Sequence, residues 1–305
     1  MSSISNSTSA FFERTLGQMG GLRQSVEKLQ AEIATGERIS RGSDDPIGAS
    51  RLRALSRIEA RGRIEAENAQ RLGQDLSAAS KEIESVSAIL QRVRELAIAA
   101  GNDPLGETGR EAIALEVEQL GEELFTRSNA RSLTGLPLFS GTLSDAAYAR
   151  DGAGNVTYQG NGQSGAVPVG PATEVERGLP GPQVFEFEMG GVPSSAFAVV
   201  SGLAAALRGG VADPAAAARD AVGGIDIAID TVNRSQTVIG TRLAWVESIQ
   251  IDQSDREIDI ARQRSDIGDT DIADAIVRLQ QAMTALEATQ AGFARVSSLT
   301  LFDAI

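Results

Sequence analysis

Apolar residues recur at intervals of three and four near both ends of this 305-residue chain. In the first segment the apolar stripe consists of Phe12, Leu16, Met19, Leu22, Val26, Leu29 and Ile33. In the last segment the stripe consists of Ile272, Ile276, Leu279, Met283, Leu286, Gln290 and Phe293. This spacing places each set on one face of a helix, and a long helix with one apolar face needs a partner. We therefore expect the two terminal segments to pair with each other.

A third heptad pattern lies in the interior of the chain and consists of Leu72, Leu76, Ala79, Ile83, Val86, Leu90, Val93 and Ala97. Its 3.5-residue repeat is typical of a coiled coil or a long helical bundle. The helix that carries it should begin at Pro46, because Asp45 can cap the free N–H groups and proline has a φ suited to the first turn. Glycine and proline within residues 101–104 should end this helix.

The stretch between the helical regions has a different composition, with clustered glycine and proline. Runs with period-two alternation at Val156–Tyr158 and Val184–Met189 predict strands, and Phe197–Val200 is expected to close the same region. Helical sequence flanks this stretch, from Thr108 to about Arg127 on one side and after residue 214 on the other, with an interruption near residue 268.

These patterns predict a mainly α fold with a β-rich insertion. A long antiparallel helical bundle or coiled coil would be formed jointly by the N- and C-terminal segments, and a small β domain would be exposed. The expected division has an N-terminal assembly helix at 1–40, a helical bundle domain built from 41–135 and 211–265, a variable β-rich domain at 136–210, and a C-terminal assembly helix at 266–305.

The amino-acid composition excludes most common kinds of catalytic site. The chain has no His and no Cys, so it has no zinc site of the usual ligands, no Cys nucleophile and no His general base. The net charge is −13 and only two basic residues are lysines, which argues against nucleic acid or an anionic membrane as a partner. The N-terminal residues do not form a Sec signal, and no apolar run approaches the length of a membrane span. We expect no enzyme activity, cofactor or metal.

Two clusters of acidic residues are candidates for a metal site or for acid–base catalysis. The aspartates at 266, 269, 271 and 274 could bind a divalent metal ion, since hard cations prefer carboxylates. Capping of a helix that restarts after Gly268 is favoured, because Asp271 and Asp274 have cap and first-turn spacing and lack the ligand order of a calcium loop. Asp44 and Asp45, beside a proline, likewise predict a turn and a cap rather than acid–base catalysis.

Several short motifs resemble those of the flagellin superfamily. The first runs from Thr35 to Ser50 and includes Gly36, Arg38, Ser43, Asp44, Asp45 and Pro46. The second includes Ser265, Ile267, Asp269, Asp271 and Ala273. Leu138–Gly141 is similar to the signature with which the family leaves its helical domain, and Ser298–Phe302 is similar to its terminal Ser-Leu-rich tail. Within the superfamily, the Asp-Asp-Pro form resembles the hook–filament junction subunits.

The resemblance implies a structural subunit of the bacterial flagellum, an adaptor at the hook–filament junction. It implies nested helical domains, export through the flagellar type III channel without a cleaved signal peptide, and an extracellular location. The implied partners are copies of the same chain, another hook-associated protein, flagellin, and an export chaperone before secretion. The terminal stripes, with Leu299, Leu301 and Phe302 of the tail, would make the assembly contacts.

Two other functions stay open. A short flagellin that forms the filament itself is the alternative from the same superfamily. A surface module whose β insertion binds a glycan or receptor, carried on a helical stalk, is the alternative from another class. Loss of function on deletion of residues 142–193 would indicate the binding module, whereas an adaptor should still be incorporated.

Overall fold

The computed structural model describes the backbone of residues 2–102 and 106–302 and the side chains of residues 10–102 and 106–296. Its elements in chain order are α1 (Ser2–Thr35), α2 (Pro46–Asn102), α3 (Glu107–Ser128), β1 (Tyr148–Arg150), β2 (Val156–Tyr158), β3 (Ala166–Gly170), β4 (Thr173–Glu176), α4 (Gly181–Phe185), β5 (Glu186–Met189), β6 (Val192–Ser195), α5 (Ala196–Ala205), the π-helical η1 (Ala206–Gly210), α6 (Pro214–Gly268) and α7 (Ile272–Phe302). They form two compact units, Met1–Ala60 with Arg256–Ile305, and Arg61–Asp255.

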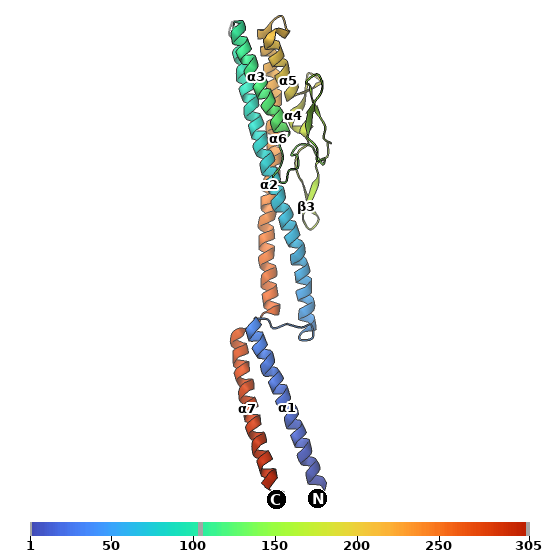
Figure 1. Ribbon diagram of the computed structural model, residues 1–305, viewed down its shortest axis with the longest axis vertical. Helices are drawn as coiled ribbons and strands as arrows, with labels where there is room; N and C mark the ends of the chain where they lie inside the picture. The colour runs from blue at the N-terminus through green and yellow to red at the C-terminus, as the bar shows by residue number, and fades with distance from the viewer. Residues whose placement is uncertain (1, 103–105, 303–305) are drawn as a thin grey trace. The chain divides into compact units, whose positions relative to one another are not determined.

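The unit Arg61–Asp255 has a continuous hydrophobic core to which α2, α3, α5 and α6 all contribute (Figure 1). The interior heptad pattern of α2 is fully buried in it, with every member at most 2% exposed. On α3, Val117 and Leu124 are buried toward the same core. A Cβ at Gly73 of α2 would lie 3.6 Å from Val246 of α6, so these two helices pack closely there. The prediction of a long buried helical seam is confirmed.

Three two-stranded antiparallel sheets, β1–β2, β3–β4 and β5–β6, form the insertion between α3 and α6. An aromatic cluster packs the insertion against its helices. Tyr148 of β1 lies 5.5 Å from Phe185 of α4 and 5.0 Å from Phe197 of α5, measured between ring centroids, and Phe139 packs edge-on against Phe185. A mainly α fold with small antiparallel sheets is therefore confirmed.

One predicted strand is helical at its start, and the segment expected to close the insertion is a helix. Val184 and Phe185 end the short helix α4, which carries proline in its first turn, and only Glu186–Met189 forms a strand. Phe197–Val200 lies in α5, whose first turn is capped by the Ser195 hydroxyl accepting the Ala198 N–H at 3.1 Å. The buried residues of α5 recur at helical spacing, so burial against the core selects a helix there.

In the unit Met1–Ala60 with Arg256–Ile305, α1 and α7 lie side by side and run antiparallel, with the start of α1 and the end of α7 at the same end of the pair (Figure 1). The predicted pairing of the terminal segments is confirmed. Pro46 begins α2 as predicted, and α6 ends at Gly268. None of the helices, over the residues that the structure describes, is both long and apolar enough to cross a lipid bilayer.

Candidate assembly interface

The contact between α1 and α7 is a seam with strict three–four alternation on both helices. On α1 the seam consists of the buried or half-buried residues Phe12, Thr15, Met19, Leu22, Val26, Leu29 and Ile33. On α7 they are Ala275, Leu279, Ala282, Leu286, Thr289, Phe293 and Val296. The rings of Phe12 and Phe293 meet edge to face, with centroids 5.2 Å apart. The terminal helices therefore form a two-stranded antiparallel pair with coiled-coil spacing.

On α1, the sequence places one seam residue wrongly. Leu16 is 55% exposed, whereas Thr15 is 8% exposed and occupies the seam position. The Thr15 hydroxyl donates a hydrogen bond of 2.9 Å to the Phe11 carbonyl, so its burial leaves no unpaired polar group. The step from Met19 to Leu22 is three, so strict alternation requires a step of four before Met19 and selects residue 15; apolar character selected residue 16. The register was thus present in the sequence, in the spacing rather than in the residue type.

On α7, the predicted stripe and the observed seam overlap only in part. Leu279, Leu286 and Phe293 are half-buried and belong to both. The other predicted members face solvent: Ile272 is 50% exposed, Ile276 41% and Met283 43%, and Gln290 is also exposed. The seam uses Ala275 and Ala282, which the stripe omits. The side chains of Leu299, Leu301 and Phe302 lie outside the described residues.

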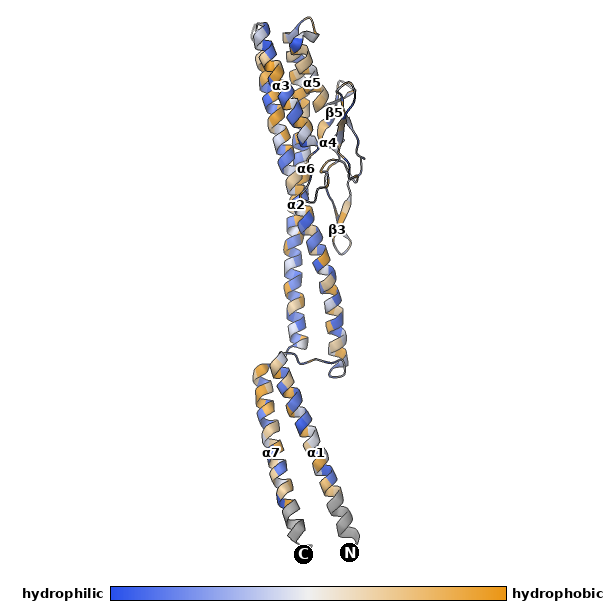
Figure 2. Ribbon diagram, viewed as in Figure 1, coloured by the Kyte–Doolittle hydropathy of each residue, from blue (hydrophilic) through white to orange (hydrophobic). Residues whose placement is uncertain are grey.

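The sequence of α7 therefore carries two apolar stripes, one facing α1 and one facing solvent. We call Ile272, Ile276 and Met283 the outer stripe. Figure 2 shows hydrophobic colouring over much of α7. An exposed apolar row on a helix that already has a partner is typical of a contact with another molecule. The assembly role of the residues in both stripes stays a prediction.

The two motif regions that are distant in sequence meet between α1 and α7. Gly36 ends α1 with a positive φ of 74°, a conformation that favours glycine. Its carbonyl accepts the N–H of Thr270 at 2.8 Å, and the N–H of Arg38 donates to the Gly268 carbonyl at 2.7 Å. Glu37 and Asp269 form an antiparallel bridge between these hydrogen bonds. The motif residues thus build one joint.

The acidic motif residues cap helices and turns. Asp45 accepts the Gly48 N–H at 2.8 Å at the start of α2, and Asp271 accepts the N–H groups of Ala273 and Asp274 at 3.0 and 3.2 Å at the start of α7. Asp44 accepts the Arg41 N–H at 2.9 Å. The hydrogen bond from the Arg41 backbone N–H is the largest cause that lowers the pKa of Asp44. The hydrogen bond from the Gly48 backbone N–H is the largest cause that lowers the pKa of Asp45.

The other residues of the two motifs have different surroundings. Ser265 donates a hydrogen bond of 2.5 Å from its hydroxyl to the carboxylate of Asp269. Beside the second motif, Asp274 pairs with Arg278 at 2.7 Å within α7. Ile267 is half-buried, and Ser43 is exposed in the turn before Pro46. Over the described residues, no group of three or more acidic side chains could hold a metal ion.

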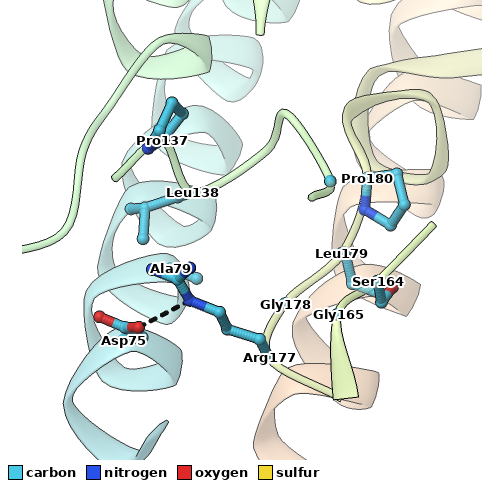
Figure 3. A pocket seen from close by; sticks show the side chains of 11 residues that line it. Asp75, Ala79, Pro137, Leu138, Ser164, Gly165, Arg177, Gly178, Leu179 and Pro180 are labelled. Atoms are coloured by element: carbon cyan, nitrogen blue, oxygen red, sulfur yellow. Dashed lines mark hydrogen bonds and ion pairs between the residues drawn. The ribbon is translucent and has the colours of Figure 1, made fainter. Parts of the chain in front are cut away.

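A pocket lies beside the β-rich insertion. It is lined by α2 and by the segments 137–141, 164–165 and 177–180 (Figure 3). The charged side chains in its lining, Asp75 and Arg177, form an ion pair with each other at 2.9 Å. The two charges thus hold the loop that carries Arg177 against α2.

Comparison with known proteins agrees with this architecture. Residues 7–144 match the N-terminal helical region of bacterial flagellin. Flagellar hook-associated protein 3 of Escherichia coli strain K12 is 26% identical, over 97% of this chain and 98% of that protein. The flagellar filament 30.7 kDa core protein of Treponema maltophilum is 26% identical, over 89% of this chain and 87% of the relative.

The solved structure of the flagellar junction protein FlgL from Legionella pneumophila shares the fold. It superposes with a TM-score of 0.59 at 16% identity, over 72% of this chain and 100% of that chain. The chain is thus similar to the N-terminal helical region of bacterial flagellin over residues 7–144, and to flagellar hook-associated protein 3 over nearly its full length.

Proposed function

We propose that this protein is a non-enzymatic structural subunit of the bacterial flagellum and acts as the adaptor at the hook–filament junction. Similarity to hook-associated protein 3 along nearly the whole chain supports this function. In the structure, the observation that carries it is α7, which pairs with α1 through one apolar stripe and leaves the outer stripe uncovered. A subunit that is complete as a monomer has no need of that second stripe.

In the proposed mechanism, the terminal pair is the part of the subunit that joins neighbours. The α1–α7 seam holds the two helices in register within one chain, and the outer stripes pack against helices of adjacent copies. The partners are copies of this chain, another hook-associated protein and flagellin. An export chaperone would hold the chain before secretion, and the assembled protein would lie outside the cell, exported without a cleaved signal peptide.

A short flagellin is the second candidate, because a filament core protein also aligns with most of this chain. The two functions differ in what the purified protein does alone. A flagellin should grow long filaments without other proteins, and an adaptor should not. Immuno-electron microscopy of intact flagella should label the hook–filament junction, whereas label along the filament would support the flagellin function.

The contribution of the outer stripe can be tested at Met283. Its side chain is 43% exposed, so Met283→Asp should leave the α1–α7 pair intact while placing a charge in the proposed contact between copies. We expect normal helicity by circular dichroism but loss of junction assembly and motility. Gln281→Asp is the matched control, because it adds the same charge to an exposed position two residues away on α7.

Two results would count against this role of the outer stripe. One is assembly of the Met283→Asp variant at the wild-type level. The other is an equal defect in the Gln281→Asp variant, which would show that any added charge on α7 interferes.

A further inference from the structure

Two connecting segments meet in the joint. Residues 36–45 join α1 to α2, and residues 269–271 join α6 to α7. The main chain crosses between them through two hydrogen bonds, from Thr270 N–H to the Gly36 carbonyl and from Arg38 N–H to the Gly268 carbonyl. Such backbone bonds can form with almost any side chain, so they do not explain the residue types at the joint.

Arg38 contributes more than its backbone. Its guanidinium Nη2 donates to the Ile267 carbonyl at 2.5 Å, while its N–H donates to the Gly268 carbonyl. Both carbonyls belong to the last turn of α6, where helix carbonyls lack intrahelical partners. One residue from the α1–α2 connector therefore caps two orphan acceptors of α6. A positive charge is also favoured at that position by the helix dipole.

The other side of the guanidinium faces α2. Nη1 lies 3.6 Å from Oδ2 of Asp45, the residue whose other carboxylate oxygen caps the first turn of α2. The guanidinium thus lies between two negative groups, the C-terminus of α6 and the N-cap carboxylate of α2. Its planar fork directs separate N–H groups at both, whereas a lysine ammonium is a single point charge. Arg38 is half-exposed, so this contact is accessible to solvent.

We infer that Arg38 is the latch of a hinge between the terminal helix pair and the helices that continue from it. With the latch closed, the two connectors are held together at Gly36–Arg38 and Gly268–Thr270. With the latch open, both connectors lose their cross-links, while α1 and α7 stay paired through their own seam. The device follows from the contacts of the joint and does not depend on the proposed function.

Hydrogen exchange followed by mass spectrometry tests the latch on the full chain. Arg38→Gln should make the amides of residues 36–40 and 267–271 exchange about three- to tenfold faster, the effect of losing one half-exposed charge-assisted hydrogen bond. Arg38→Lys keeps the charge but loses the fork and should give an intermediate rate. Amides of residues 61–255 should not change.

Arg41→Gln is the matched control. It removes the same charge from the same connector, and over the described residues the Arg41 side chain makes no hydrogen bond or ion pair. The inference is overturned if Arg38→Gln exchanges at the same rate as Arg41→Gln at the joint. It is also overturned if Arg38→Gln speeds exchange throughout residues 61–255, because Arg38 would then support global stability rather than a local hinge.

Discussion

Two tyrosines of the β-rich insertion belong to one aromatic cluster but differ in the hydrogen bonding of the phenolic hydroxyl. Their ring centroids are 5.2 Å apart. The hydroxyl of Tyr158 donates to the carbonyls of Phe139 and Asn161, at 3.0 and 2.8 Å. Tyr148 is 2% exposed, and its hydroxyl has no hydrogen-bond partner over the described residues. Replacing each tyrosine with phenylalanine removes the same atom from two different environments.

The two substitutions should affect the free energy of unfolding differently. For Tyr158→Phe, loss of the hydrogen bond and exposure of carbonyls to an apolar ring should lower the free energy of unfolding by about 1–2 kcal/mol. For Tyr148→Phe, the lost atom is a buried polar group that makes no bond, so the free energy of unfolding should stay unchanged or rise by up to about 1 kcal/mol. Desolvation is also the largest cause that raises the pKa of Tyr148.

Urea unfolding of the full chain measures this difference. Trp245, the chain's single tryptophan, lies on α6 in the same compact unit as both tyrosines and reports on its unfolding by fluorescence. With a slope of about 2–3 kcal/mol/M, Tyr158→Phe should move the midpoint down by roughly 0.5 M, and Tyr148→Phe should not lower it. Equal loss in both variants would refute the reasoning, because the Tyr148 hydroxyl would then have a partner such as a buried water.

The joint and α2 give further expectations. Gly36→Ala should lower stability by about 1 kcal/mol, because φ is +74° there, and Gly62→Ala, at an uncrowded position inside α2, should raise it by a similar amount. Thermal unfolding followed by circular dichroism measures both changes. If both variants shifted the melting temperature in the same direction, the argument from backbone conformation would be contradicted. Because the folded pKa values of Asp44 and Asp45 are lowered, their stabilisation is present above the ordinary carboxyl pKa near 3.9 and is lost as pH falls below it. Replacing both with Asn should shrink the drop in melting temperature between pH 5 and pH 3, and an undiminished drop would exclude them as its source.

The long helices could be predicted because local and global signals agree along them. In α2 the strict 3.5-residue repeat coincides with complete burial, and the start at Pro46 is fixed by the Asp45 cap. Charged residues occupy the other faces, so a shifted register would bury charge. At the joint, only the cap at Asp271 was predicted, because it depends on neighbours a few residues away. The hydrogen bonds that join residues 36–38 to 268–270 connect segments far apart in sequence and were not predicted.

The insertion could not be predicted to the same extent, because its elements are short and depend on distant packing. Val184–Met189 satisfies the period of a strand, yet Phe185 packs in the aromatic cluster from the end of a helix. In a five-residue helix, one buried contact outweighs the local preference for either structure. Strands of three to five residues, such as β1 and β3, leave too few alternations to be recognised.

The terminal helices carry large apolar side chains that the single chain leaves exposed. A lone α1–α7 pair would be more stable with leucine in the seam and threonine outside, but Thr15 is buried and Leu16 is 55% exposed. On α7 the alanines of the seam are small, while the larger Ile276 and Met283 face solvent. Both helices therefore keep large apolar side chains on faces that the fold does not use. On both helices, large apolar residues are exposed while smaller residues are buried. A contact between copies that covered the exposed faces would bury those apolar residues.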